Sequence, residues 1–176
     1  MTDASEHCPV PSLSGLILGV LALLLFLPAL ALGQSYAGTE QSVRDGDTVH
    51  LLRQTGQIVR IELSGIDAPE LRQSYGRAAA RAVRRAVFRA KVRARAEGRD
   101  EDGRPLFVLE VGDRMLNEQL VRKGLAWWDR AEAPHANRLR RLERRARADE
   151  RGLWAQRNPV PPWDWRKQND GQNDGS

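Results

Sequence analysis

Polar and apolar residues alternate from position 47 to position 66, with one interruption at the stretch QTGQ. Successive side chains of a β-strand point to opposite faces, so this alternation predicts two strands at about 47–53 and 57–66, each with one buried face. The glycine in QTGQ is typical of a hairpin turn. A similar pattern around the stretch DEDGR predicts a second hairpin over residues 91–111.

The apolar spacing changes to three and four residues in three later stretches, which predicts amphipathic helices over residues 75–90, 114–126 and 136–154. Gly124 and Gly152 are the expected helix stops. Strands closed into a small barrel, with these helices packed outside, make an α+β fold. An OB-like barrel is a suitable architecture for it.

The chain has 176 residues, and its first 33 differ in composition from the rest. Residues 13–32 are uncharged and nearly all aliphatic. This stretch is long for the core of a signal peptide and just long enough to span a bilayer. Small residues near Ala31 favour cleavage by a signal peptidase, whereas the lack of Lys and Arg ahead of the stretch argues against it. A cleaved signal peptide, a membrane anchor and a buried core helix remain as alternatives, and the buried helix fits a terminal, charge-free stretch least well.

These patterns divide the chain into a leader at 1–33, one globular domain at 34–166 and a polar disordered tail at 167–176. Cleavage of the leader would give a periplasmic or secreted protein, whereas an intact leader would hold the domain at a membrane. The only cysteine, Cys8, lies in the leader. The domain is therefore expected to have neither a disulfide nor a thiolate metal site.

The formal net charge is +5, and because the first 33 residues contain two acids and no base, the remainder carries +7. This excess favours polyanions such as nucleic acid or an anionic membrane as partners. The arginines on the first and third predicted helices have two interpretations. They contact nucleic acid, or they form a solvated face that pairs with neighbouring acids.

Two short stretches place carboxylates at turns. RDGDTV contains Asp45 and Asp47 ahead of the first predicted strand, and SGIDAPEL contains Asp67 and Glu70 after the second. Each stretch alone is compatible with an ordinary solvated turn, because Asp, Gly and Pro are common turn residues. The paired ends of an antiparallel hairpin lie close together, so the two turns are expected to share a site.

Six motifs occur in a fixed order along the chain: DGDT, GIDAPE, YG, DGR, LNEQLVRKGLAWW and ERGLW. In this order and spacing, from about residue 42 to 166, the chain resembles the thermonuclease family, the staphylococcal-nuclease-like domains. The resemblance implies a five-stranded OB-fold β-barrel with about three packed helices, in a monomer. It also implies a Ca²⁺-dependent endonuclease that hydrolyses phosphodiester bonds of DNA and RNA and leaves 3′-phosphate ends.

The resemblance assigns roles to five positions of this sequence. Asp47 and Asp67 match the two carboxylates that bind Ca²⁺, and the backbone carbonyl of Ala68 matches a further ligand. Oxygen donors without His or Cys suit this hard cation. Glu70 matches the general base that acts on the attacking water. Arg104 matches an arginine that contacts the scissile phosphate, and a solvated turn arginine beside acidic residues is the alternative.

The sequence departs from the family at a second phosphate-binding arginine, which normally stands five residues before the second aspartate. Glu62 occupies that position here. Arg60 lies two residues earlier and shares a strand face with Glu62, so it is the substitute that we expect to reach the phosphate. A local bulge that shifts Arg60 into place is an alternative.

Aromatic residues that pack on the nucleotide base in the family are also replaced. Asp102 stands at the tyrosine position ahead of GR, and Asp129 and Glu132 stand where tyrosines commonly follow LAWW. We therefore place Asp102 and Trp128 at the substrate-binding positions, although core packing is the alternative for Trp128 and for its neighbour Trp127. Base stacking contributes about 1–3 kcal/mol per base, so substrate is expected to bind weakly or differently.

Two functional hypotheses follow. Retention of the metal, base and Arg104 positions favours an exported Ca²⁺-dependent nuclease with a modified phosphate site. The glutamate at position 62 and the lost tyrosines favour a weak or inactive nuclease-like domain that binds nucleic acid or protein. We prefer the enzyme, because the metal and base positions would be free to drift in a pure binding module.

Overall fold

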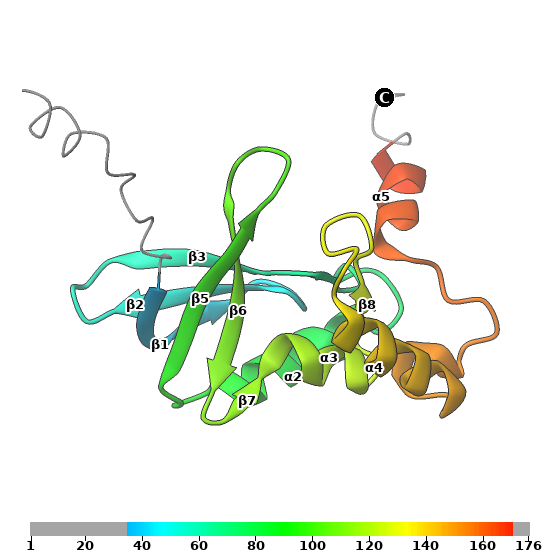
Figure 1. Cartoon of the computed structure of the whole chain (residues 1–176), viewed down its shortest axis with the longest axis horizontal. Helices are drawn as coiled ribbons and strands as arrows, with labels where there is room; N and C mark the ends of the chain where they lie inside the picture. Colours follow the sequence, from blue (N-terminus) through cyan, green and yellow to red (C-terminus); the bar gives the residue numbers. More distant parts are fainter. Residues whose placement is uncertain (1–34, 171–176) are drawn as a thin grey trace, which may run out of the picture. The chain divides into compact units, whose positions relative to one another are not determined.

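Five strands close into a small barrel in the structure, a computed structural model that describes residues 35–170. The antiparallel order β3-β2-β1-β5-β6 is closed by parallel pairing of β3 with β6. The strands are β1 (Ser35–Val43), β2 (Thr48–Arg53), β3 (Ile58–Leu63), β5 (Val92–Arg99) and β6 (Pro105–Val111) (Figure 1). This closed mixed barrel, with helices packed outside it, confirms the predicted α+β, OB-like fold.

Apolar residues at alternate positions fill the barrel. On β2 and β3 the buried side chains include Val49, Leu51, Ile61 and Leu63, while the residues between them on the two strands are more exposed. Phe107 of β6 is fully buried among the same strands. The alternation that predicts the first hairpin is therefore the pattern that builds the core.

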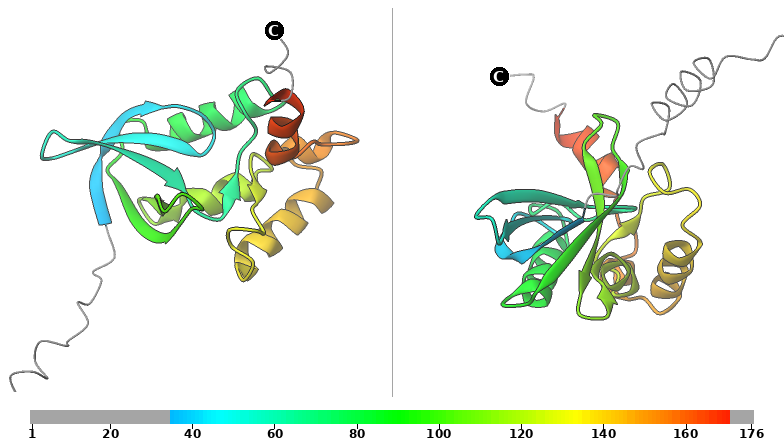
Figure 2. Two further views of the ribbon diagram at one scale, coloured as in Figure 1. Left: turned by 90° about the horizontal axis from the view of Figure 1, so that it is seen from above. Right: turned by 60° about the vertical axis from the view of Figure 1, so that its left-hand side comes forward.

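Helices cover the outside of the barrel in the described part of the chain. They are α2 (Gly76–Val87), α3 (Leu116–Arg122), α4 (Asn137–Ala148), the 3₁₀ helix η1 (Gly152–Ala155) and α5 (Pro162–Asp170). Helix α3 contacts both α2 and α4, and α5 lies near β8 (Figures 1 and 2). Short strands complete the fold: β4 (Ile66–Asp67), β7 (Arg114–Met115) and β8 (Trp127–Trp128).

The predicted elements are present with shifted ends. The helix predicted at 114–126 begins later, because Arg114 and Met115 pair with β6 as strand β7. The helix predicted at 136–154 ends at Ala148, because Glu150 and Gly152 adopt φ angles of 51° and 57° that a right-handed helix does not allow. η1 follows as a separate turn.

Among the longer elements, β1 and α5 were not predicted. The β1 sequence contains few large apolar residues and a register shift between Glu40 and Ser42, so its alternation is weak. Helix α5 begins with Pro162, a residue that suits the first helical position. It continues past residue 167, where the polar tail was expected to begin, and ends at Asp170. The described residues therefore form four α-helices, where about three were expected.

A buried asparagine joins α3 to the barrel and to the segment ahead of Asp67. Asn117 accepts a hydrogen bond from the backbone N–H of Leu109 at 3.0 Å. Its side-chain amide donates to the backbone carbonyls of Ser64 (2.9 Å) and Phe107 (3.1 Å). Since every polar group of this side chain is used, it fixes the chain at residue 64 relative to β6.

The arginines of α2 face solvent, which is compatible with both interpretations: Arg77, Arg81 and Arg85 are exposed. On α4, Arg147 pairs with the buried carboxylate of Glu143 at 3.4 Å.

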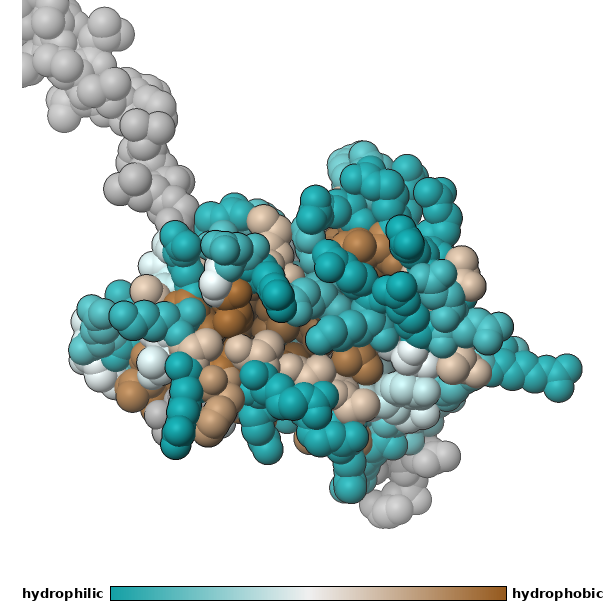
Figure 3. Space-filling view, turned by 90° about the horizontal axis from the view of Figure 1, so that it is seen from below, coloured by the Kyte–Doolittle hydropathy of each residue, from teal (hydrophilic) through white to brown (hydrophobic). Residues whose placement is uncertain are grey.

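Figure 3 shows one face of the molecule, where hydrophilic side chains surround a patch of apolar residues.

The predicted leader, with its apolar stretch at 13–32, lies outside the described residues. Within residues 35–170, no helix is both long enough and apolar enough to cross a bilayer.

Candidate active site

The first acidic turn is held by its own side chain. Asp45 Oδ1 accepts hydrogen bonds from the backbone N–H groups of Asp47 (3.2 Å) and Thr48 (2.7 Å), which fixes the turn at the start of β2. Gly46 has no room for a side chain, because a Cβ atom there would lie 2.5 Å from the Cβ of Ala68. The turn therefore packs directly on the second acidic turn.

The second acidic turn starts in β4, where Asp67 pairs opposite Trp127 of β8. Pro69 is fully buried, and Glu70 follows it. The backbone N–H of Gln73 donates to the carbonyl of Glu70 at 2.8 Å, and the Gln73 side chain accepts from the N–H of Glu70 at 3.2 Å. Gln73 thus fixes the backbone of Glu70 through both the N–H and the carbonyl of that residue.

The two turns meet at one hydrogen bond and one cavity. The backbone N–H of Ala68 donates to Asp47 Oδ2 at 2.6 Å. A cavity of about 320 Å³, which we call the acid centre, is lined by Asp45, Asp47, Asp67 and Glu70. The predicted meeting of the two turns is confirmed, while the chemical roles of these residues stay predictions.

Burial sets the electrostatics of the acid centre. It raises the pKa of Asp47 well above its ordinary value, and the nearby carboxylates of Asp45 and Asp67 raise it further. Burial also raises the pKa of Asp67, whereas hydrogen bonds and charge from Arg166 lower it in part. Two neighbouring carboxylates that are costly to ionise favour a positive partner between them.

An arginine of helix α5 supplies positive charge there, and sequence reasoning missed it. The Arg166 guanidinium donates from one terminal nitrogen to Asp67 Oδ2 at 2.7 Å. The other terminal nitrogen donates to Glu70 Oε1 at 2.9 Å and to Asp67 Oδ1 at 3.2 Å. Hydrogen bonds to Asp67 raise the pKa of Arg166. The stretch PPWDWR was the available signal for this helix, but it does not show where the helix docks.

Glu62 and Arg60 lie on the same face of β3, as the alternation predicts, and both line the acid centre. Their side chains form an ion pair at 2.9 Å. The register between β2 and β3 runs without interruption through both residues, so the alternative of a local bulge is wrong. Arg60 therefore reaches the cavity with its charge already paired.

Arg104 and Asp102 lie beside the acid centre, at the turn between β5 and β6. The Arg104 guanidinium pairs with Asp100 at 2.6 Å and with Asp102 at 2.7 Å. They line an adjoining cavity of about 510 Å³. Its other acidic lining residues include Glu62, Asp129 and Glu132. The motif arginine is thus held by the acids of its own turn.

Core packing accounts for both tryptophans of the LAWW motif. Trp128 is 6% exposed, and its ring N–H donates to the carbonyl of Ala133 at 2.9 Å. Trp127 is equally buried and packs edge-on against Trp154, with ring centroids 4.3 Å apart. Trp128 also lines a neighbouring cavity, and its substrate-binding role stays a prediction.

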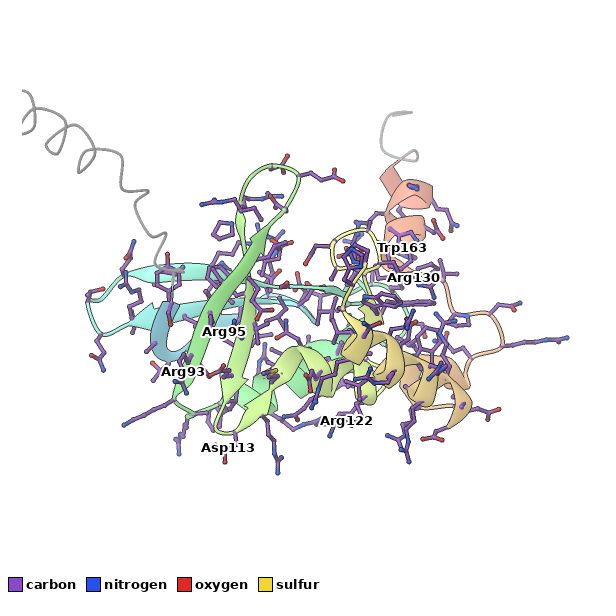
Figure 4. The ribbon with its side chains drawn as sticks, viewed as in Figure 1. Arg93, Arg95, Asp113, Arg122, Arg130 and Trp163 are labelled. Atoms are coloured by element: carbon purple, nitrogen blue, oxygen red, sulfur yellow. The ribbon has the colours of Figure 1, made fainter. Side chains whose placement is uncertain are left out.

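That cavity is mostly apolar, has a volume of about 530 Å³ and adjoins the acid centre. The two cavities share Asp67 and Arg166 in their linings. Trp163 of α5 and Arg130 also line it, and Figure 4 shows these two side chains at the same end of the molecule. Helix α5 therefore contributes to both cavities.

The donor chemistry of the acid centre fits a hard divalent cation. Asp47 and Asp67 offer carboxylate oxygens, which Ca²⁺ prefers. Within residues 35–170, no three Asp, Glu, His or Cys side chains are grouped closely enough to hold a metal ion together. A cation at these two aspartates would therefore need further ligands such as water and a backbone carbonyl; Ala68, predicted to supply the carbonyl, lines the same cavity.

Comparison with known proteins shows which family the chain belongs to. Residues 60–156 match the family model described as "Staphylococcal nuclease homologue". The chain is 38% identical over 126 residues to an uncharacterized endonuclease of Escherichia coli O157:H7, in an alignment that covers 70% of this chain and 80% of the relative. The chain is a staphylococcal nuclease homologue.

Two further relatives of this staphylococcal nuclease homologue differ in length. The staphylococcal-like nuclease CAN1 of Arabidopsis thaliana is 36% identical over 114 residues, which are 65% of this chain and 35% of the relative. Protein ParB of Escherichia coli is 32% identical over 140 residues, which are 74% of this chain and 78% of the relative.

The family match covers only part of the acid centre of this staphylococcal nuclease homologue. The matched residues 60–156 include Asp67, Glu70 and Arg104. Asp47 precedes this range and Arg166 follows it. The segments on both sides of the match therefore complete the site.

Proposed function

We propose that this staphylococcal nuclease homologue is a Ca²⁺-dependent endonuclease that hydrolyses phosphodiester bonds of DNA and RNA and leaves 3′-phosphate ends. One observation carries the proposal: the predicted metal carboxylates, Asp47 and Asp67, and the predicted base, Glu70, line one cavity. The relatives named as endonuclease and as nuclease support it.

The residues of the acid centre suit hydrolysis. A bound divalent cation would supply positive charge to the phosphate and stabilise the charge that develops in the transition state. Glu70 accepts a proton from the attacking water as the water oxygen bonds to phosphorus. The bond from phosphorus to the 5′-oxygen breaks, and that oxygen takes a proton from solvent. The Glu70 side chain is 34% exposed, so water reaches it and it can return its proton to solvent.

The proposal is tested on the full chain in a mild detergent, because residues 13–32 are apolar. Labelled single-stranded DNA and RNA are incubated with wild type and with Glu70→Gln, in Ca²⁺ and in chelator. Wild type should cleave in Ca²⁺ alone, and loss of the base should slow cleavage by about 10²- to 10⁴-fold. Glu97→Gln is the matched control, because Glu97 pairs with Arg95 on β5, outside the acid-centre lining. Equal cleavage in chelator would contradict Ca²⁺ dependence.

A non-catalytic binding module is the second candidate, and the pairing of the arginines favours it. Arg60 is paired with Glu62, and Arg104 with Asp100 and Asp102, so the guanidinium groups predicted to stabilise the reacting phosphate are already occupied, which opposes catalysis. If the chain is such a module, a filter-binding assay should show that it binds DNA or RNA. A cleavage assay in Ca²⁺ should show no shortened products. Cleavage by wild type that Glu70→Gln removes would exclude this candidate.

Export is part of the proposal and is supported by the apolar stretch at 13–32. Cleavage near Ala31 would give a periplasmic or secreted monomer, and N-terminal sequencing of the mature protein measures this. An intact N-terminus in the membrane fraction would show an anchor instead. Light scattering of the purified protein tests the monomer.

A further inference from the structure

The acid centre contains more carboxylates than free guanidinium groups. Its lining includes Asp45, Asp47, Asp67, Glu70 and Glu62, together with Asp129 and Glu132. A nucleic-acid phosphate is an anion, so this excess opposes its binding unless positive charge is added. The two positive charges of one divalent cation at the aspartates would leave the phosphate still facing the remaining acids.

The basic residues of the cavity differ in their ion-pair partners, and therefore in how readily each could bind a phosphate. Arg60 is paired with Glu62 at 2.9 Å. Arg44 is 62% exposed and lies 3.9 Å from Asp45, at the rim of the lining. Arg166 alone among the described arginine side chains of this lining contacts the two groups on which the proposed reaction depends, Asp67 and Glu70.

Helix α5 holds Arg166 in place by contacts that do not involve this side chain. The Gln73 side chain donates to the carbonyl of Val160 at 2.5 Å, just ahead of the helix. The Trp163 ring packs edge-on against Trp127, with centroids 5.8 Å apart. These contacts keep the backbone of α5 beside the acid centre, so the Arg166 guanidinium stays within reach of it when the carboxylates take other ligands.

Binding of a divalent cation by Asp67 would change what Arg166 contacts. Both Asp67 oxygens now accept from Arg166, at 2.7 Å and 3.2 Å. When Asp67 gives these oxygens to a cation, guanidinium N–H groups are freed between Asp67 and Glu70. A phosphate held between the aspartates and a water at Glu70 would lie beside these N–H groups, because Asp67, Glu70 and Arg166 line one cavity. The planar fork of a guanidinium matches two oxygens of a phosphate.

We propose that Arg166 is a catalytic residue that binds the non-bridging oxygens of the scissile phosphate and so takes the role left open by Glu62. This inference rests on the proposed nuclease function. Helix α5 then forms one wall of the substrate site, and the freed guanidinium stabilises the negative charge of the transition state. The reaction itself is unchanged: water adds to phosphorus, Glu70 takes its proton, and the 5′-oxygen leaves.

The test compares full-length wild type with Arg166→Ala, Arg166→Lys and Lys167→Ala. Lys167 is the matched control, because it is an exposed base on the same helix outside the acid-centre lining. In Ca²⁺, Arg166→Ala should lower kcat on single-stranded DNA by about 10²- to 10³-fold, as expected for loss of one preorganised donor. Arg166→Lys should restore part of this loss, and Lys167→Ala should cleave like wild type.

A second readout does not depend on cleavage. A deoxynucleoside 3′-phosphate, the proposed type of product, is titrated in Ca²⁺ by calorimetry. Its Kd should be about 10- to 100-fold higher for Arg166→Ala than for wild type, as expected when a charge-assisted hydrogen bond is lost. Ca²⁺ titrated alone should bind Arg166→Ala at least as tightly as wild type, because the cation no longer competes with the guanidinium for Asp67.

Three results would overturn the inference. Faster cleavage by Arg166→Ala would mean that the arginine blocks the site. An unchanged kcat and product Kd with a lower Tm would mean a purely structural role, and weaker Ca²⁺ binding would mean that Arg166 organises the aspartates. A wild type that cleaves neither DNA nor RNA would overturn the proposed function instead, and the product titration would still decide the role of Arg166.

Discussion

Asp47 Oδ2 accepts a hydrogen bond of 2.6 Å from the backbone N–H of Ala68, so the carboxylate of one acidic turn holds the backbone of the other. The bond joins the start of β2 to the end of β4. It places Asp47 beside Asp67 at a cost, because burial and the neighbouring carboxylates raise the pKa of Asp47. A bound cation would offset this cost, because it stabilises the ionised form of both carboxylates.

Asp47→Asn separates the structural role of this side chain from its charge. The amide oxygen can still accept from Ala68, while the buried negative charge is removed. In chelator at neutral pH, the variant should therefore melt a few degrees above wild type. Ca²⁺ at 100 times its Kd should stabilise wild type by about 2.7 kcal/mol and the variant by much less. Thermal melts with and without Ca²⁺ measure both effects, and an equal Ca²⁺ response in the variant would remove Asp47 from the metal site.

The stability of the metal-free protein should depend on pH through Asp47 and Asp67. Their pKa values are raised by burial, so the folded state binds protons at pH values where the unfolded state has lost them. Stability from these groups is therefore gained as pH falls through the raised pKa values toward the ordinary value of about 4. Melts in chelator from neutral to acidic pH should show the advantage of Asp47→Asn shrinking as pH falls. A constant difference would mean that Asp47 has an ordinary pKa.

Charge reversal at Glu62 tests the modified phosphate site. Glu62→Arg removes a carboxylate from the acid-centre lining and frees Arg60 from its 2.9 Å ion pair. Ca²⁺-dependent kcat/KM should rise by about 10²-fold, the effect of one added donor in such a site.

Glu97→Arg is the control for this prediction, because Glu97 forms the same kind of two-residue-apart pair with Arg95 on another strand. It should leave kcat/KM unchanged. If Glu62→Arg only lowers Tm and cleavage stays constant, Glu62 serves the barrel rather than the reaction.

Asn117→Ala should destabilise the domain. It leaves the buried N–H of Leu109 and the carbonyl of Ser64 without the partners that the asparagine provides. Each such loss costs about 1–3 kcal/mol, so a total on the order of 3 kcal/mol is expected in denaturant unfolding. Asn117→Asp keeps the acceptor for Leu109 but loses the donors, and it should also be destabilised. A loss below about 0.5 kcal/mol in both variants would show that these bonds are replaced by water.

The periodic spacing of apolar residues predicted those parts of the fold that depend on residues close together in the sequence. Alternation in residues 47–66 gave the hairpin, the shared face of Arg60 and Glu62, and the meeting of the two acidic turns. These features follow from strand geometry, because side chains repeat every second residue and paired strand ends are close.

The contact between Arg166 and Asp67 could not be predicted in this way. It joins positions that are 99 residues apart. Its geometry depends on how α5 docks, and that docking uses Trp163 against Trp127 and the bond from Gln73 to Val160. Neither contact leaves a periodic signal in the sequence. The proline and tryptophan content of the segment indicated an unusual tail, and the helix itself was missed.

The position of α5 affects how this protein is best produced for study. The family match ends at residue 156, before the helix begins at Pro162. A chain trimmed to that boundary would keep Asp47, Asp67 and Glu70 while losing the guanidinium that lies across two of them. An affinity tag joined directly after the helix would lie near the acid centre, which Arg166 lines, so a tag at the C-terminus needs a long spacer.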